Sequence, residues 1–187
     1  ALDYFTNRIS AGLLLLTILF YVFVYTIWLK RKTPQNIVIG GAAGAFPPVI
    51  GWTIATNSLS IEPLAFFLII FFWTPSHFWA LSLYKSDDYK KANIPMLPLT
   101  NGVESTKFNI FIYSLLMLPV IIFPYFINFV GLAFLLPALI LTLYYNFLCY
   151  ELYNYKKNKF NPKKAKSIFG YSILYLFLVF VLFLIDK

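Results

Sequence analysis

The sequence predicts an all-α, polytopic membrane helical bundle, and three observations lead to that prediction. Hydrophobic residues make up 60% of the 187 residues and charged residues only 12%, a composition that a water-soluble domain could not cover with polar surface. Several uncharged stretches approach the roughly 20 residues that one helical crossing of a bilayer requires. These stretches lack the alternation of a membrane barrel, and because backbone amides must be paired in hydrocarbon, helices are favoured.

The uncharged stretches define the predicted spans. The fourth is about two spans long and must fold back as a hairpin with its turn at Asn128–Gly131, so about six helices are expected. No long hydrophilic linker divides the chain, which predicts one membrane domain over residues 1–187. The stretches are Ala11–Leu29, Ile37–Leu59, Pro63–Tyr84, Phe108–Tyr150 and Ser167–Ile185.

The distribution of basic residues predicts the orientation of the bundle. The formal net charge is +8. If the N-terminus lies outside and successive spans cross the membrane in alternating directions, only Arg8 and Lys187 fall on the outer side. Positively charged loops remain in the cytoplasm, so the other side is predicted to be cytoplasmic. Because this distribution accounts for the positive charge, no nucleic-acid partner is predicted. The basic residues on that side are Lys30, Arg31, Lys32, Lys85, Lys90, Lys91, Lys107, Lys156, Lys157, Lys159, Lys163, Lys164 and Lys166.

Two segments have unusual composition, and each has two interpretations. The second span contains Gly40–Pro48 (GGAAGAFPP), which either packs tightly against other helices or forms a backbone wall against a bulky ligand. The loop Ala92–Pro98 carries two prolines that impose extended backbone on an apolar strip. This strip either covers a site or forms a stiff connection at the membrane surface. Cys149, the one cysteine, excludes a disulfide framework and is interpreted as a core residue.

Basic residues close the first full span, where Lys30, Arg31 and Lys32 precede the start of the next span at Asn36. Two interpretations remain open. Cations at this boundary satisfy the positive-inside rule, and Trp28 suits an interfacial belt. Alternatively, the bidentate guanidinium and the point charge of the ammonium suit a diphosphate that must be held while its ester bond breaks.

An acidic pair, Asp87 and Asp88, follows Tyr84 and Lys85 where the third span reaches the cytoplasm. The two carboxylates either are solvated loop residues or hold Mg²⁺, which binds through one or two carboxylates and substrate phosphates. A metal held there would neutralise charge that develops on a diphosphate leaving group.

His77, the only histidine, lies deeper in the third span. A histidine in a span is commonly a hydrogen-bonded bundle residue, yet polar groups at that depth are functional candidates. Because a neutral imidazole can ligate iron, contact with a haem is the alternative.

Several segments, taken together, resemble the protohaem IX farnesyltransferases (haem O synthases) among the UbiA-like intramembrane prenyltransferases. Their order and spacing cover about Tyr25 to Gly102, and from Phe108 onward only hydropathy supports the resemblance. The matching segments are Tyr25–Thr33 (YTIWLKRKT), Asn36–Gly41 (NIVIGG), Pro47–Trp52 (PPVIGW), Pro75–Leu81 (PSHFWAL), Asp87–Tyr89 (DDY) and Ile94–Pro98 (IPMLP).

The resemblance implies a nine-helix bundle with two Asp-rich motifs that face each other through Mg²⁺. It implies transfer of a farnesyl group from farnesyl diphosphate to a vinyl group of haem b, which gives haem O for terminal oxidases. By resemblance, Asp87 and Asp88 match the second motif and ligate the metal. Lys30 and Arg31 match the diphosphate-binding position, and Tyr25 matches a tyrosine that stabilises the allylic cation. The residues expected to bind the substrates are Asn36, His77, Tyr84 and Lys85.

The first Asp-rich motif of the family has no counterpart in this sequence, and Asp3 does not supply it. Ala1–Phe5 resemble the end of a preceding span, so about three N-terminal helices are expected to be missing, and the activity of this chain alone is left open. The expected location is the bacterial cytoplasmic (inner) membrane, in preference to the mitochondrial inner membrane, with the active site facing the cytoplasm. Besides the substrates and the lipid bilayer, a homo-oligomer and a haem A synthase are candidate partners.

Three rival interpretations remain. The chain resembles other UbiA-like prenyltransferases in general, which would change the acceptor. A transporter or channel fragment should carry charges at the membrane midplane, and the spans carry none there. A non-catalytic membrane subunit predicts that Asp87 and Lys30 tolerate alanine.

Overall fold

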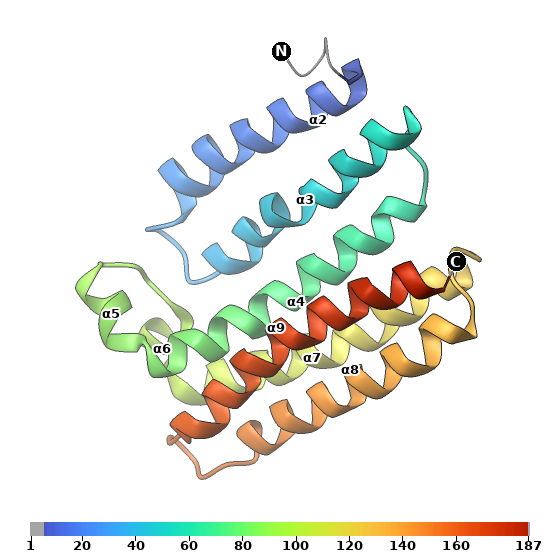
Figure 1. The fold of residues 1–187 in the computed structure, drawn as a ribbon. Coiled ribbons are helices and arrows are strands. Elements are labelled where there is room, and N and C mark those ends of the chain that lie inside the picture. The colour runs from blue at the N-terminus through green and yellow to red at the C-terminus, as the bar shows by residue number, and fades with distance from the viewer. Residues whose placement is uncertain (1–5, 187) are drawn as a thin grey trace.

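The structure, a computed structural model, describes residues 6–186 as a bundle of long helices (Figure 1). Within this part of the chain, six helical segments are long and apolar enough to cross a membrane, which confirms the predicted number. Predictions that concern Ala1–Phe5 and Lys187 lie outside the described residues. The long segments are α2 (Arg8–Leu19) continuing into η1 (Phe20–Leu29), α3 (Asn36–Thr56), α4 (Glu62–Tyr84), α7 (Gly102–Phe126), α8 (Leu132–Tyr153) and α9 (Pro162–Ile185).

Two short helices, α5 (Ser86–Lys91) and α6 (Leu97–Thr100), connect α4 to α7. The extended backbone predicted for Ala92–Pro98 is found at Met96, but Ala92 and Asn93 form a turn, with φ of 53° at Asn93, and Leu97 begins α6. Both Met96 and Leu97 are buried, and α6 contacts α4 and α7. The strip therefore packs onto the ends of these two helices.

The hairpin predicted at Asn128–Gly131 is confirmed, since α7 ends at Phe126 and α8 begins at Leu132. Asn128 adopts a left-handed backbone with φ of 56°, a conformation that asparagine tolerates better than most residues. At the same end, a carboxylate oxygen of Asp186 accepts a hydrogen bond from the backbone N–H of Phe134 at 2.9 Å. The last helix is thereby tied to the start of α8.

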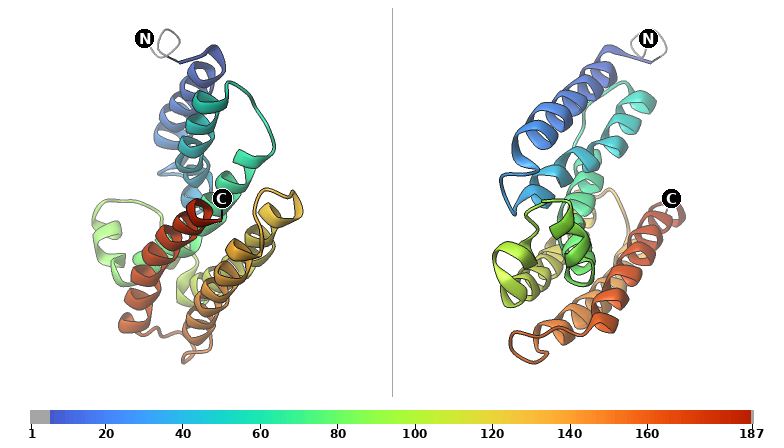
Figure 2. Two further views of the ribbon diagram at one scale, coloured as in Figure 1. Left: turned by 45° about the vertical axis from the view of Figure 1, so that its right-hand side comes forward. Right: turned by 90° about the vertical axis from the view of Figure 1, so that its left-hand side faces the viewer.

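The arrangement of the helices places the loops with the basic residues at one end. Figure 1 shows the start of α2 and the end of α9 at one end of the bundle and α5 and α6 at the opposite end. We call the end formed by α5, α6 and the turn between η1 and α3 the mouth. Figure 2 shows α2 and α3 on one side of α4 and α8 on the other, and α4 contacts α3, α7 and α9.

Hydrogen bonds link the helices around α4 in the interior. The Ser76 hydroxyl of α4 bonds to the Tyr145 hydroxyl of α8 at 2.7 Å, and the Thr142 hydroxyl bonds to that of Tyr175 on α9 at 3.0 Å. All four side chains are buried. Cys149 is also fully buried, as predicted for a core residue. Such interhelical bonds satisfy polar groups where lipid offers no partner.

The first span differs from the single regular helix that the uniform apolar run suggested. Its second half, η1, is π-helical, and the backbone N–H of Lys30 donates to the carbonyl of Tyr25, five residues earlier, at 2.7 Å. Long π-helices are rare, and π-helical turns occur frequently at functional sites. The wider winding sets the direction in which the Tyr25 and Lys30 side chains leave the helix.

Lys107 requires a correction, because the sequence placed it among the loop cations. It lies in α7 and is 0% exposed. Its ammonium pairs with Glu104 at 2.7 Å and donates to the backbone carbonyl of Tyr155 at 2.9 Å. The carbonyls of Lys156 and Lys159 are further acceptors. These acceptors replace water, so the ammonium is buried where the α8–α9 connection folds over it.

Candidate active site

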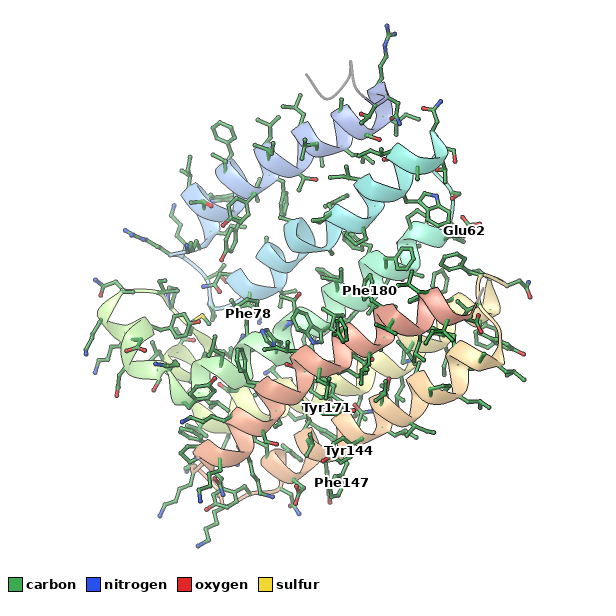
Figure 3. The ribbon with its side chains drawn as sticks, in the orientation of Figure 1. Glu62, Phe78, Tyr144, Phe147, Tyr171 and Phe180 are labelled. Atoms are coloured by element: carbon green, nitrogen blue, oxygen red, sulfur yellow. The ribbon has the colours of Figure 1, made fainter. Side chains whose placement is uncertain are left out.

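A cavity of about 330 Å³, the mouth cavity, lies between η1, α3 and α4. Figure 3 shows Phe78 of its lining near the end of α4 that leads to α5, far from Glu62 at the other end of the same helix. Most of the lining is apolar or aromatic, so the cavity suits a hydrocarbon group better than a charged one. The lining residues are Tyr21, Tyr25, Ile37, Gly40, Gly41, Gly44, Ile70, Trp73, Thr74 and Phe78.

A second cavity of about 370 Å³ continues along the same two helices toward the opposite end. Its lining includes Pro48 of α3 and Phe66 of α4, each four residues, or about one helical turn, beyond Gly44 and Ile70 of the mouth cavity. Phe180 of α9, labelled in Figure 3, closes part of it. The groove between α3 and α4 therefore offers apolar space along much of its length.

The basic residues of the mouth follow η1 directly. Lys30 is partly buried, and its ammonium lies 5.9 Å from the centre of the Tyr25 ring. Arg31 is exposed. Among residues 6–186, the ion pairs involve other lysines, and neither Lys30 nor Arg31 has a carboxylate within salt-bridge distance. Both cations are open to an anionic ligand.

Asn36 fixes the backbone of the turn that carries these cations. Its side chain is buried, with 1% of the residue exposed. The amide Nδ2 donates to the carbonyl of Lys30 at 3.1 Å, while Oδ1 is buried without a hydrogen-bond partner among the described residues. The sequence predicted Asn36 as a substrate-binding residue, and the structure shows it bound to the turn.

The acidic pair lies on α5. Asp87 and Asp88 are exposed in its first turn, where a negative charge interacts favourably with the helix dipole. Asp88 pairs with Lys85 at 3.1 Å, with the two side chains 62% and 54% exposed. Exposed pairs of this kind contribute little stability, so the Asp88 carboxylate can exchange Lys85 for another cation.

Tyr89 links the acidic helix to the basic side of the mouth. Burial raises the pKa of its phenol, and the neighbouring Tyr84 and Asp88 raise this pKa further. Tyr89 also lies close enough to Tyr25 for the two phenols to interact electrostatically. α5 and η1 thus lie at the same end of the bundle, although their backbones do not pack directly against each other. In the described part of the chain the structure shows no direct ion pair between Asp87 or Asp88 and Lys30 or Arg31.

The carboxylates of Asp87 and Asp88 could supply some, but not all, of the ligands of a Mg²⁺ ion at the mouth. Asp87 and Asp88 supply hard oxygen donors on an exposed helix, and Mg²⁺ in phosphate-binding sites uses one or two carboxylates together with phosphate oxygens. No cluster of three or more His, Cys, Asp or Glu side chains occurs within residues 6–186. A metal at the mouth would therefore need oxygens beyond the acidic pair.

His77 lies in the interface between α4 and α9. Its ring stacks between Trp73 and Phe169, with centroids 4.2 and 4.6 Å away, and it is not among the residues that line the mouth cavity. The Ser172 hydroxyl donates to the carbonyl of Phe169 at 2.6 Å, so its oxygen accepts from Nδ1 of His77, also at 2.6 Å. This arrangement is typical of a hydrogen-bonded bundle histidine and leaves Nε2 as the nitrogen with a lone pair.

Tyr84, at the end of α4, is partly buried and faces the α9 side of the mouth. Its ring lies 6.2 Å from that of Phe169, and the ammonium of Lys166 lies 5.6 Å from its centre. Two residues predicted to bind substrate, His77 and Tyr84, therefore share Phe169 as a neighbour. Lys85 begins the step from α4 to α5.

The glycines of α3 combine the two interpretations proposed for this span. Gly40 lies so close to the ring of Tyr25 that a methyl group would not fit. Gly41 packs against the side chain of Thr74, where a methyl group would require a small shift of that side chain. Gly44 has open space beside it and lines the mouth cavity. Tight packing and a bare wall thus occur on neighbouring faces of one helix.

The sequence did not identify the lining residues Tyr21, Ile70 and Phe78. A signal was present in α3, where the lining residues follow helical spacing at Ile37, Gly40, Gly41 and Gly44. In η1 and α4, nearly every residue is apolar, so no periodicity separates the cavity side from the lipid side.

Comparison with known proteins gives matches along nearly the whole chain. Residues 1–181 match the UbiA prenyltransferase family. The chain is 84% identical over 187 residues to a protoheme IX farnesyltransferase of Pelagibacter ubique (strain HTCC1062), a match that covers 100% of this chain and 62% of that protein. No solved structure matches the chain significantly.

Two further relatives carry the same name. The protein of Parvibaculum lavamentivorans is 52% identical over 181 residues, which cover 97% of this chain and 57% of the relative. That of Neorickettsia sennetsu is 47% identical over 180 residues, which cover 96% of this chain and 58% of the relative. The chain thus spans about three-fifths of the length of these curated relatives.

Proposed function

The chain belongs to the UbiA prenyltransferase family, and on this premise we propose that the protein is a protohaem IX farnesyltransferase. It transfers a farnesyl group from farnesyl diphosphate to a vinyl group of haem b and so forms haem O. The observation that carries this choice of substrates is the 84% identity, over all 187 residues, to a relative of that name. The geometry of the mouth supports the chemistry.

In this proposal the diphosphate binds at the basic side of the mouth. Arg31 offers paired N–H donors to phosphate oxygens and Lys30 a point charge. Both are without a carboxylate partner among the described residues, and Asn36 holds the turn between them and α3 through the Lys30 carbonyl. Lys85, paired only weakly with Asp88, is a further cation for the same anion.

Asp87 and Asp88 would hold Mg²⁺ together with diphosphate oxygens and the first Asp-rich motif that the family resemblance implies. When bound, the ion would neutralise the charge that develops on the diphosphate as its bond to the farnesyl group breaks. The two carboxylates are exposed at the mouth, so a diphosphate can reach them without rearrangement of the bundle.

The farnesyl group would occupy the mouth cavity, where Tyr25 forms part of the wall. Its aromatic face is suited to an allylic cation because the ring quadrupole attracts positive charge. The apolar lining would keep water away from the cation. If His77 contacts the haem, it does so through Nε2, since Nδ1 is committed to Ser172.

The chain is an integral membrane protein, with six candidate spans within residues 6–186. We place it in the bacterial cytoplasmic membrane with the mouth toward the cytoplasm, because the lysine-rich loops gather at that end and the named relatives are bacterial. A homo-oligomer and a haem A synthase that accepts the product remain candidate partners.

The proposal is tested with the complete gene product in lipid nanodiscs, supplied with haem b, farnesyl diphosphate and Mg²⁺. Haem O should form, and Asp88→Ala should lower its rate on the order of a hundredfold or more, because electrostatic stabilisation of the leaving group is lost. Lys91→Ala, an exposed change on the same helix, serves as the control. Full activity of the Asp88→Ala protein would refute the assigned site.

The second candidate is another prenyltransferase of the same family with a different acceptor. The match to the family over residues 1–181 favours the reaction type more strongly than the acceptor. Release of diphosphate that depends on Asp88, without haem O as a product, would support this alternative.

A further inference from the structure

The Tyr25 ring lies directly on the backbone of α3 at Gly40. A Cβ atom at position 40 would stand 2.5 Å from Cε2, 2.8 Å from Cδ2 and 2.9 Å from Cζ of the ring. Carbon atoms in favourable contact are about 3.5–4.0 Å apart. Any residue other than glycine at this position therefore requires the ring to move.

The surroundings of the ring limit where it can go. Tyr21 flanks it along the same helix, with ring centroids 5.3 Å apart, and the Lys30 ammonium lies 5.9 Å from its centre. Tyr25 and Gly40 both line the mouth cavity. A ring pushed away from α3 would move toward the cavity or toward Lys30.

We propose that Gly40 is a positioning residue. Because glycine has no side chain, the Tyr25 ring can pack directly against α3 and is held at the wall of the mouth cavity. This inference rests on the proposed function, in which the ring faces the allylic group. Gly40 itself touches neither the diphosphate nor the metal ligands. Its replacement should therefore impair the reaction of bound farnesyl diphosphate more than the binding of the diphosphate.

The neighbouring glycines supply matched comparisons. Gly41 packs against Thr74 of α4, and a methyl group at position 41 would stand 3.0 Å from Cγ2 of that threonine, so a substitution there strains packing without touching Tyr25. Gly51 lies in the same helix with open space beside it and outside the cavity lining. Gly51→Ala controls for the general effect of a methyl group on α3.

The first experiment tests the contact by thermal unfolding of the complete gene product in nanodiscs. Gly40→Ala should lower Tm when residue 25 is tyrosine. In the Tyr25→Ala background it should leave Tm unchanged or raise it, because the ring is gone and alanine forms helices better than glycine. Gly51→Ala should shift Tm equally in both backgrounds.

Equal losses from Gly40→Ala in the two backgrounds would overturn the inference, since coupled residues must deviate from additivity. If the single variant fails to assemble, recovery in the double variant supports the contact. A double variant that also fails shows that Gly40 serves another purpose and overturns it.

The second experiment measures haem O formation. Gly40→Ala should lower kcat by on the order of tenfold to a hundredfold, the scale expected when a reacting group is misplaced by about 1 Å. The KM for farnesyl diphosphate should change by a smaller factor than kcat, because the cations of Lys30 and Arg31 are retained. Gly51→Ala should keep full activity.

An unchanged kcat in the Gly40→Ala protein would contradict the positioning role. Absence of haem O from the wild-type protein would instead contradict the proposed function. The unfolding experiment would then still decide whether Gly40 seats the ring, so the two failures can be told apart.

Discussion

Two lysines at the mouth end of the bundle use their charge in opposite ways. The Lys107 ammonium is fully buried, paired with Glu104 at 2.7 Å and bonded to backbone carbonyls of the α8–α9 connection. The Lys30 ammonium has no carboxylate partner among residues 6–186 and rests 5.9 Å from the centre of an aromatic ring. The Lys107 ammonium is fully engaged within the protein, whereas the Lys30 ammonium is available to a ligand.

A similar distinction separates several hydroxyl groups of the bundle interior from the charged groups of the mouth. Inside, hydroxyl groups pair across helices, as Ser76 does with Tyr145. At the mouth, Asp88 has one exposed ion pair and Asp87 has none among the described residues. We therefore assign structural roles to partnered polar groups such as Ser76 and Lys107, and we propose ligand binding for the uncompensated charges at the mouth. The following predictions test this division.

The largest effect on stability is expected from Lys107→Met. Removing the ammonium leaves several backbone carbonyls without a donor, and each buried group left unsatisfied costs about 1–3 kcal/mol. The Glu104 side chain is 38% exposed, so it is solvated after the change and adds little to the loss. Denaturant unfolding in detergent micelles measures the loss. Lys157→Met, an exposed change in the adjoining connection, should have almost no effect. A stability equal to wild type would show that Lys107 is not the anchor of the α8–α9 connection.

A smaller effect, and on substrate binding instead of stability, is expected from Lys30→Met. A charged hydrogen bond to a phosphate is worth about 1.5–3 kcal/mol, so the KM for farnesyl diphosphate should rise roughly tenfold to a hundredfold. Tm should stay close to that of wild type, because the side chain makes no ion pair in the described structure. Steady-state kinetics with varied farnesyl diphosphate provides the measurement. A fall in Tm with unchanged KM would reverse the assignment of the two lysines.

The contrast between Lys30 and Lys107 also shows how far sequence reasoning reaches. The six spans and the hairpin at Asn128 followed from hydropathy and length, which are properties of the bilayer as solvent. Lys107 was misplaced because its acceptors come from a connection some 50 residues later in the chain. No local pattern reports a partner that only the tertiary fold supplies.

The candidate site also combines residues that the sequence identified with features that only the structure shows. Charge identified Lys30, Arg31, Asp87 and Asp88, since charged residues are conspicuous between apolar spans. The π-helical winding of η1 and the seating of Tyr25 on Gly40 were not predictable, because a run of apolar residues carries no signal for the change from α to π geometry. Those features decide where the aromatic wall of the cavity stands.

A modest loss of stability is expected from Ser76→Ala in the interior. The change removes the hydrogen bond to the Tyr145 hydroxyl, and interhelical hydrogen bonds in membrane proteins contribute about 0.6 kcal/mol on average and at most about 1.7. Because Ser76 lies outside the cavity lining, haem O formation should persist in the folded fraction. The free energies of unfolding of wild type, Ser76→Ala, Tyr145→Phe and the double variant give the coupling free energy between the two hydroxyl groups. Additive effects of the two changes would show that the bond contributes nothing.

The smallest effect concerns the pH dependence of Tyr89, which lies on the boundary between the mouth and the interior. Its pKa is raised, chiefly by burial and further by Tyr84 and Asp88, so the folded state favours the neutral phenol. The stability that this preference contributes is fully present below about pH 10, the ordinary pKa of tyrosine, and is lost as the pH rises through the raised value. Tyr89→Phe cannot ionise, so the stability of wild type should decline relative to the variant above about pH 10. Thermal unfolding of both proteins from about pH 9 to 11 tests this, since the titration of the lysines is common to both and cancels. A constant difference across that range would mean that Tyr89 is as solvated when folded as when unfolded.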